Sequence, residues 1–266
     1  MVLLCVTNVG PHGCDINIAD TNGCTPLIAA THVDVLKLLL GDKSCDIAAR
    51  SFNGMTALRA AIIRQDVEAV KLLLSFASCP VNGSDLIHYT PLNMAVICRN
   101  SAIVKAMLTS THAENIDVNA YAGEGEWQCT PLHQACLNGD IEIVRDILTT
   151  GRAHINVKTS KGCTPLHVAC ISGHADVAAL LALHESCDVN AQDYDGTTPL
   201  HFAVDSCGNI DTTRALMSCN RIKPNMRNSL GFTPLDVATM LDKAPIAELL
   251  LSHRNWKADS GDMLCQ

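Results

Sequence analysis

Two stretches of the sequence combine cysteine and histidine at a spacing that could bind a metal ion. The motif Cys-x3-His-x2-Cys occurs over residues 129–136 and again over residues 163–170. Thiolate sulfur and imidazole nitrogen are ligands that zinc sites use, and exposed thiols can also respond to oxidants. One interpretation of the chain is therefore a zinc-based or thiol-based sensor.

The positions of the cysteines favour a packing role instead. Nine of the fourteen cysteines keep a fixed distance from a recurring threonine, and they are Cys14, Cys45, Cys79, Cys187, Cys24, Cys129, Cys163, Cys136 and Cys170. Most of them stand where a small residue is expected, and cysteine packs as a small hydrophobic residue. His133 and His167 belong to the same recurrence, and no Cys-x2-Cys pair exists. The sensor interpretation stays open as an alternative.

Other catalytic motifs are missing from the sequence. It contains no phosphate-binding Walker loop, no dinucleotide-binding fingerprint and no nucleophile elbow. Serine, histidine and aspartate occur widely, but no spacing brings them into one constellation. We therefore expect a protein that is not an enzyme and that takes no cofactor.

The composition excludes several other classes of protein. Hydrophobic residues make up 48% of the 266 residues, charged residues 17%, and the formal net charge is −8. Such a chain can bury a large core, whereas a nucleic-acid binder would normally carry a basic excess. No apolar run approaches the roughly 20 residues that span a bilayer, and the N-terminus is a poor secretory signal. We expect no nucleic-acid binding, no membrane insertion and an intracellular location, in the cytoplasm or the nucleus.

The chain repeats itself with a period of 31 to 40 residues. The phrase Thr-Pro-Leu, or Thr-Ala-Leu in one copy, begins at Thr25, Thr56, Thr90, Thr130, Thr164, Thr198 and Thr233. Each copy continues into an apolar cluster and then into a phrase such as Asp-Val-Asn. Repetition at a fixed period is the signature of a stacked repeat architecture.

Each copy predicts two short helices joined by turns. Threonine is a good N-cap, and proline suits the first helical position because its missing N–H had no partner there. The second helix shows apolar residues at helical spacing, as in the range 67–74. A glycine two residues before the threonine, present in five copies, predicts a left-handed turn.

This pattern resembles the ankyrin repeat. The resemblance implies a mainly α fold, an ankyrin-repeat solenoid of stacked antiparallel helix pairs with β-hairpin or loop fingers. It covers residues 14–252, preceded by a partial repeat or loop over residues 1–13 and followed by a polar tail over residues 253–266. The abrupt start predicts that the chain is a piece of a longer array, or that a partner covers this end. We expect a monomer.

Several copies depart from the regular pattern. The first is three residues short between Ala30 and Val35, which predicts a shortened turn. The fourth gains three residues within Thr109–Asn115 and three within Tyr121–Gln128. His88 and Gln128 replace the expected glycine in the third and fourth copies. The insertions are interpreted as tolerated surface loops or as a specialised contact.

The resemblance implies that a protein partner docks on the fingers and on the concave face of the first helices. Six of the nine aromatic residues fall on the expected fingers, where other apolar residues join them. Aromatic side chains are favoured interface anchors. The predicted contact residues are Phe52, Met55, Leu86, Ile87, Tyr89, Tyr121, Glu124, Glu126, Trp127, Tyr194, Leu230 and Phe232, with Tyr121, Trp127 and Tyr194 foremost. Packing on the adjacent finger is the competing interpretation, above all for Tyr89 and Phe232.

An acidic stretch adds a second expectation about the partner. No lysine or arginine lies between Lys105 and Arg145, and the interval holds six carboxylates: Glu114, Asp117, Glu124, Glu126, Asp140 and Glu142. Such a stretch would steer a basic segment of a partner toward it, although a solvated face explains the charges equally simply.

The repeated Asn residues have an expected structural role. The resemblance implies that Asn17, Asn82, Asn119, Asn156 and Asn190 brace the loops, and it leaves hydroxylation of an Asn open.

Three functions follow from these observations. The first is a non-catalytic scaffold or adaptor that binds a protein partner. The second is a substrate-recruiting arm or fragment of a larger assembly, such as a ubiquitin ligase adaptor, a channel or a signalling protein. The third is the thiol or zinc sensor.

Overall fold

The computed structural model describes residues 15–85, 88–123, 128–205 and 210–252. Within these ranges the protein has fourteen α-helices, one short 3₁₀ helix and no β-strand. The chain divides into two compact units. Unit 1 comprises Met1–Gly125 and Arg145–Arg152, and unit 2 comprises Glu126–Val144 and Ala153–Gln266. The expected mainly helical fold is confirmed.

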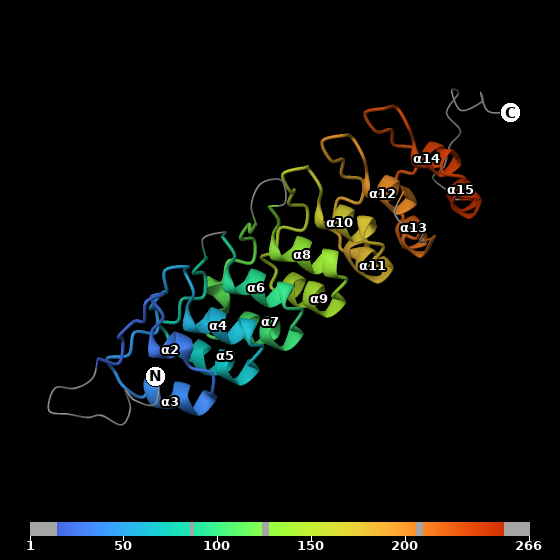
Figure 1. Ribbon diagram of the computed structural model, residues 1–266. Coiled ribbons are helices and arrows are strands. Elements are labelled where there is room, and N and C mark those ends of the chain that lie inside the picture. The colour runs from blue at the N-terminus through green and yellow to red at the C-terminus, as the bar shows by residue number, and fades with distance from the viewer. Residues whose placement is uncertain (1–14, 86–87, 124–127, 206–209, 253–266) are drawn as a thin grey trace. The chain divides into compact units, whose positions relative to one another are not determined.

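Unit 1 holds three helix pairs in two layers (Figure 1). The first helices, α2, α4 and α6, pack on one another, and so do the second helices, α3, α5 and α7. Each first helix also packs on the second helix that follows it. The bounds are α2 (Pro26–Ala29), α3 (Val33–Leu40), α4 (Ala57–Ile63), α5 (Val67–Leu74), α6 (Pro91–Ile97) and α7 (Ser101–Leu108), followed by η1 (Ala113–Asn115).

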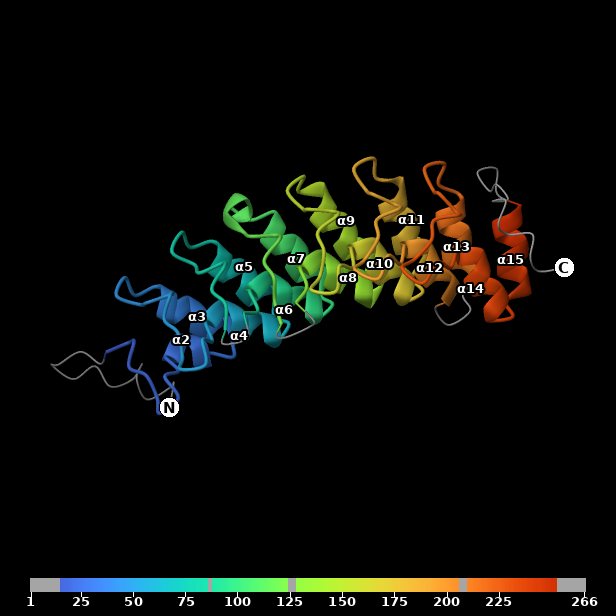
Figure 2. The ribbon, with the colours of Figure 1, turned by 90° about the horizontal axis from the view of Figure 1, so that it is seen from above.

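Unit 2 repeats the same arrangement. Its first helices α8, α10, α12 and α14 pack in one layer, and its second helices α11, α13 and α15 pack in another (Figure 2). Helix α9 (Ile141–Thr149) is divided between the two units. The other bounds are α8 (Pro131–Asn138), α10 (Pro165–Ile171), α11 (Ala175–Leu183), α12 (Pro199–Asp205), α13 (Ile210–Met217), α14 (Pro234–Met240) and α15 (Ala244–Leu251).

Stacking supplies the core of each unit. The leucine two residues after the repeat threonine is at most 2% exposed in the first six repeats, whereas Leu235 of the seventh repeat is half-buried. Small residues, such as Ala61, Ala95, Ala135 and Ala169, are fully buried where first helices meet. One helix pair has only one apolar side to bury, so the next pair must cover the other.

In five of the seven first helices, the first turn is organised by the threonine and the side chain three residues later. The backbone N–H of Thr164 donates to Nδ1 of His167 over 3.0 Å, and the Thr164 hydroxyl lies 2.8 Å from the same nitrogen. Asn93 and Asp236 accept from Thr90 and Thr233 in the same way. These contacts satisfy donors that a helix start otherwise leaves without partners.

The same side chain also reaches the next hairpin. His133 Nε2 lies 3.1 Å from the carbonyl oxygen of Cys163, and the His167 and His201 rings make equivalent contacts with Thr197 and Phe232. Because Nδ1 accepts a backbone N–H, Nε2 carries the proton and donates to the carbonyl. The histidines therefore brace the next hairpin against the helix start, and the two bonds fix the neutral tautomer.

Loops are joined from repeat to repeat by the repeated asparagines. Asn156 accepts a bond from the backbone N–H of Asp188 over 2.8 Å and donates to the carbonyl of Ser186 over 2.7 Å. Asn17, Asn82 and Asn190 make the same pair of bonds with the loop that follows each of them. The second repeat has Ala48 at this position, and the expected donor in the next loop is Pro80, which has no N–H.

The irregular copies take the forms that their lengths require. The first repeat was expected to have a shortened turn, but it is helix α2 that is short, with four residues. Three residues separate α2 from α3, as three separate α4 from α5, so the turn keeps its length. The first insertion of the fourth repeat contains η1. His88 adopts φ +64°, the left-handed conformation that glycine takes at this place in five hairpins, whereas Gln128 has no positive φ.

The buried histidines make stability depend on pH. Burial lowers the pKa of His133 and His167 from 6.5 to about 4, and it also lowers the pKa of His201. Between pH 6.5 and pH 4 the histidines of the unfolded chain bind protons that those of the folded chain do not. The free energy of unfolding is therefore highest above pH 6.5 and decreases as the pH falls toward 4. We expect a slope of at most about 1.4 kcal/mol per pH unit for each histidine, measured by urea unfolding across this range.

Asparagine provides the matched control, because Asn93 makes the same two contacts without titrating. Replacing His133, His167 and His201 together with asparagine should keep the fold and flatten the dependence of stability on pH over this range. A slope as steep as that of the unaltered protein would contradict the assignment of the pH dependence to these rings.

The asparagine braces predict a second stability effect. Asn156→Ala should lower the free energy of unfolding by about 1–2 kcal/mol, because two hydrogen bonds are lost. In the second repeat, Ala48→Asn alone lacks the backbone N–H that the asparagine would accept, because residue 80 is proline. Combined with Pro80→Asp, it should show a favourable coupling of about 1 kcal/mol in a double-mutant cycle measured by chemical denaturation. Strict additivity would show that the brace does not form there.

Candidate partner-binding surface

In six of the seven copies, a short polar side chain stands five residues before the repeat threonine and can close the finger. Asp193 Oδ1 accepts the backbone N–H groups of Asp195 and Thr197 over 3.0 and 2.8 Å. The sequence analysis missed this position, although its signal is present as Asp20, Ser51, Asp85, Thr159, Asp193 and Asn228. The bonds hold the hairpin turn in one shape, so residues at the tip have fixed positions.

Neighbouring fingers are also bonded to one another. In unit 1 the Phe52 N–H donates to the carbonyl of Asn22 over 3.0 Å. In unit 2 the Tyr194 N–H donates to the carbonyl of Lys161 over 3.4 Å, and the Ser229 N–H donates to that of Asp195 over 2.9 Å. In each of these three pairs, the tip of the later finger is held in place by a backbone hydrogen bond to the finger before it.

Two aromatic rings stand on these aligned tips. Phe52 is 78% exposed and Tyr194 is 70% exposed, and both occupy the position four residues before the threonine. A Cβ atom on Gly162 would lie 2.9 Å from Cδ1 of the Tyr194 ring, and one on Gly23 would lie as close to the Phe52 ring. Each ring thus rests on a glycine of the preceding finger while its other face meets solvent. The Lys158 Nζ atom lies 6.0 Å from the centre of the Tyr194 ring.

The other predicted contact residues fall into three groups. Tyr121 is 44% exposed and Leu230 is 77% exposed. The three residues directly before the threonine are half-buried, and these are Met55, Tyr89 and Phe232. Leu86, Ile87, Glu124, Glu126 and Trp127 lie outside the described residues.

The half-buried group takes part in the structure of the hairpins. The Tyr89 N–H donates to Asp85, and Phe232 both donates to Asn228 and accepts from His201. Tyr89 and Phe232 are therefore tied into the hairpin through their backbones, and their side chains are half-buried there.

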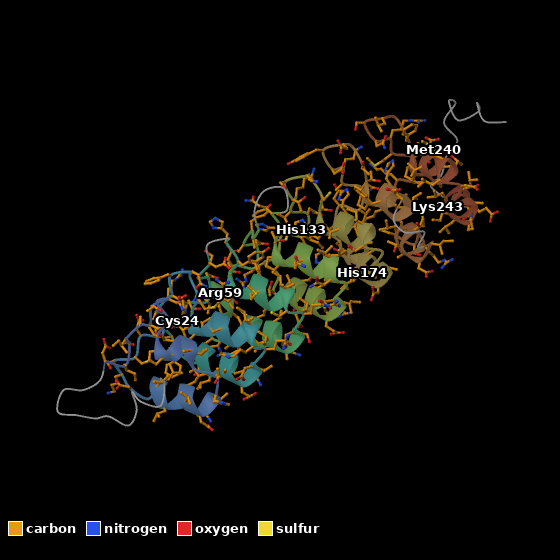
Figure 3. All side chains as sticks on the ribbon, viewed as in Figure 1. Cys24, Arg59, His133, His174, Met240 and Lys243 are labelled. Atoms are coloured by element: carbon orange, nitrogen blue, oxygen red, sulfur yellow. The ribbon has the colours of Figure 1, made fainter. Side chains whose placement is uncertain are left out.

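The first helices present a second exposed surface, whose residues the sequence analysis did not name. In the last six repeats the residue seven positions after the threonine is exposed, and it is large and apolar in five of them. These residues are Ile63 and Ile97 in unit 1, and Leu137, Ile171, Asp205 and Met240 in unit 2. Met240 is labelled in Figure 3. The signal in the sequence is a large aliphatic residue at a helical position that the core does not need.

The Cys-x3-His-x2-Cys motifs do not form metal sites. Both ring nitrogens of His133 and His167 are hydrogen-bonded within the protein, and Cys136 and Cys170 are fully buried. Burial raises the pKa of both thiols, and it raises that of Cys187 to about 12. Across the described parts of the chain, no three histidine, cysteine or acidic side chains converge on a common point. Cys136, Cys170 and Cys187 therefore act as small core residues.

The acidic stretch is only partly available to a partner. Glu114 lies 3.9 Å from the Arg152 side chain, which also donates to the backbone carbonyls of Ala113, Glu114 and Ile116. Asp117 accepts the backbone N–H of Asn119. These carboxylates help to shape the loop after α7.

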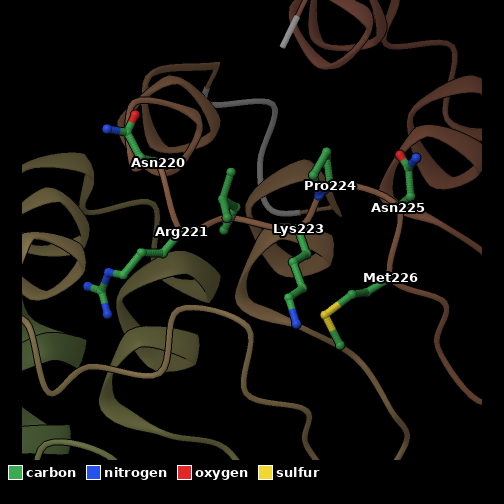
Figure 4. Close-up of a pocket in the computed structure, with 7 residues that line it drawn as sticks. Asn220, Arg221, Lys223, Pro224, Asn225 and Met226 are labelled. Carbon is green, nitrogen blue, oxygen red and sulfur yellow. The ribbon is translucent and has the colours of Figure 1, made fainter. Parts of the chain in front are cut away.

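A shallow hollow lies beside the loop after α13 (Figure 4). Its volume is about 510 Å³, and residues 220–226 line it. The Arg221 guanidinium donates to the carbonyls of Ala182, His184, Glu185 and Cys187, so its donors already have partners. Among the described helices, none is both long and apolar enough to cross a membrane.

The contact between ring and glycine makes a testable prediction. Gly162→Ala should destabilise unit 2 and shift the NMR signals of the Tyr194 ring, because the new methyl group occupies the place of the ring and φ is +82°. Gly231 has a similar φ of +84° with nothing within 4 Å of an added Cβ, so Gly231→Ala isolates the backbone cost of about 1 kcal/mol. Equal effects of the two substitutions on stability and on the ring signals would contradict the contact.

Comparison with known proteins agrees with this geometry. The family model described as ankyrin repeats (3 copies) matches residues 31–122, 119–193 and 181–262. A search of curated proteins found no match. The matched ranges follow one another along most of the chain and contain the helix pairs, hairpins and histidine contacts described above. The chain belongs to the ankyrin repeat family.

Proposed function

We propose that this chain is a non-catalytic scaffold or adaptor that binds a protein partner through its fingers and the exposed side of its first helices. Ankyrin repeats are generally protein–protein interaction modules. A fold of this kind hosts many unrelated roles, so the argument rests on the surface itself.

The observation that carries the proposal is the display of rigid aromatic rings on bonded fingers. Phe52 and Tyr194 are more than two thirds exposed, yet their backbones are hydrogen-bonded to the preceding finger and their rings rest on glycines. Aromatic residues held in one conformation lose little entropy when a partner covers them. Solvent-exposed rings that contribute little to the core are well suited to act as anchors.

Charge and thiol chemistry support two further parts of the proposal. The net charge of −8 suits a partner with a basic segment, which long-range attraction would steer toward the chain. The ten cysteines within the described residues are free thiols. Free thiols persist in reducing compartments, so we place the function inside the cell, in the cytoplasm or nucleus. A role as the substrate-recruiting arm of a larger assembly is one form of this adaptor function.

Removing the displayed rings tests the proposal. The triple variant Phe52→Ala, Tyr121→Ala, Tyr194→Ala should keep its helical circular dichroism and unfolding midpoint, because these side chains are exposed. It should lose at least about tenfold in affinity for partners captured from a cell extract and then purified, since aromatic anchors dominate interface energies. Affinity is measured by biolayer interferometry.

A matched control removes the same number of exposed apolar side chains from the second helices. Leu38, Leu183 and Leu251 are 56%, 78% and 47% exposed, and their triple replacement by alanine should leave capture unchanged. If the finger variant binds as tightly as the unaltered chain, the fingers are not the interface. If both variants lose binding equally, general adhesion explains the capture.

A further inference from the structure

The exposed side of the first helices in unit 2 carries one side chain per helix in a single column. The column consists of Leu137, Ile171, Asp205 and Met240, each seven residues after its threonine. Helices α8, α10, α12 and α14 pack side by side in this order, so the four side chains follow one another across the layer. Leu137, Ile171 and Met240 are 50%, 42% and 66% exposed, and Asp205 is exposed as well.

A second column broadens this surface. Gln134, Val168, Phe202 and Val237 stand three residues earlier on the same helices, and all four are half-buried. Residues three apart lie on the same side of a helix. Together the two columns form a mainly apolar strip, of the kind that marks a docking surface.

The exposed column combines aliphatic side chains with one acidic side chain. Three positions are aliphatic and the third in order, Asp205, is a carboxylate. No ion pair or hydrogen bond of that carboxylate occurs within the described residues. The ammonium group of Lys243, a residue labelled in Figure 3, donates to the backbone carbonyls of Val204 and Asp205 at the end of α12. A complementary partner therefore has two apolar contacts, one cationic contact and one more apolar contact in order.

The backbone around the strip offers little to an extended peptide. The Leu137 carbonyl accepts from His174, and those of Val204 and Asp205 accept from Lys243. An extended strand would bury its own N–H and C=O groups against aliphatic side chains without partners. A helix satisfies these groups internally, so the strip favours a helical occupant.

The spacing of the column fixes the period of that helix. Packed helices lie about 8–10 Å apart. Seven residues of an α-helix rise about 10.5 Å, so one residue per heptad meets one helix of the layer. Four contacts require a helix of about 22 residues or more.

We propose that unit 2 binds an amphipathic helix whose contact residues recur every seventh position, aliphatic opposite Leu137, Ile171 and Met240 and lysine or arginine opposite Asp205. This rests on the proposed function as a protein-binding scaffold and names the class of partner segment. The Asp205 carboxylate sets the register and direction of the helix, because only one heptad position carries the matching cation.

Designed peptides test this directly. Two monomeric helical probes of about 26 residues carry three leucines and one lysine at four successive heptad positions, with lysine third in one probe and second in the other, to cover both directions. One probe should bind the full chain and gain helical circular dichroism on binding, and a scrambled peptide should not. Affinity is measured by fluorescence anisotropy. If neither probe binds better than the scrambled peptide, or if binding brings no gain in helix, the proposal is overturned.

Substitutions in the chain locate the site. Ile171→Lys should weaken binding of the probe by about tenfold, and Leu183→Lys on α11, where the side chain is 78% exposed, should leave the affinity unchanged. Asp205→Lys should weaken binding by about threefold or more, and a probe with glutamate in place of lysine should then regain it. Loss of binding with Leu183→Lys, or no rescue by the glutamate probe, would contradict the assigned site.

The two proposals fail in distinguishable ways. If the probes do not bind but the finger triple variant still loses its captured partner, the helix proposal is wrong and the scaffold function stands. If the captured partner binds the finger variant normally and the probes bind the column, the role given to the fingers is wrong and the helix-binding strip stands.

Discussion

In repeats two to six, one buried polar side chain on the first helix contacts the hairpin that follows. In three of these repeats it is a histidine that accepts from its own threonine and donates to a carbonyl of the next finger. The histidine rings are buried, so losing either bond leaves a polar group without a partner, which costs more than an ordinary hydrogen bond gains. The position of the finger that displays Tyr194 depends on the bridge from His167.

The same position can carry different chemistry and still contact the next finger. Asn93 replaces the ring with an amide and reaches the Ala120 carbonyl over 3.3 Å. Arg59 reaches the Asp85 carboxylate of the next finger over 2.6 Å and is only 2% exposed. Such a pair is costly to break, because a buried charge would remain. The contact with the next finger thus comes from the same position, three residues after the threonine, although the residue type at that position varies.

Much of the fold follows from the sequence, and the site follows less completely. Threonine, proline and the turn glycines fix where each helix begins, so the helix pairs and the loop-bracing role of Asn156 were predictable. The shortening of the first repeat was predicted for the turn but lies in α2. The left-handed φ of His88 was also implied, because it stands at a glycine position. Exposure was harder to predict. Phe52 and Phe232 both lie on fingers, yet a shift of three residues relative to the threonine makes one a displayed ring and the other half-buried. The column that contains Ile171 was missed because an aliphatic residue on a helix is ordinarily assigned to the core.

The side chains of that column have a separate consequence for how such proteins diversify. They contribute little to the packing between helix pairs, and the histidine bridges lie elsewhere on the same helices. Evolution can therefore rewrite Leu137, Ile171, Asp205 and Met240 one at a time without refolding the protein around them. Each replacement changes one contact residue of the binding surface, so a new binding specificity can arise by single substitutions while the fold is kept.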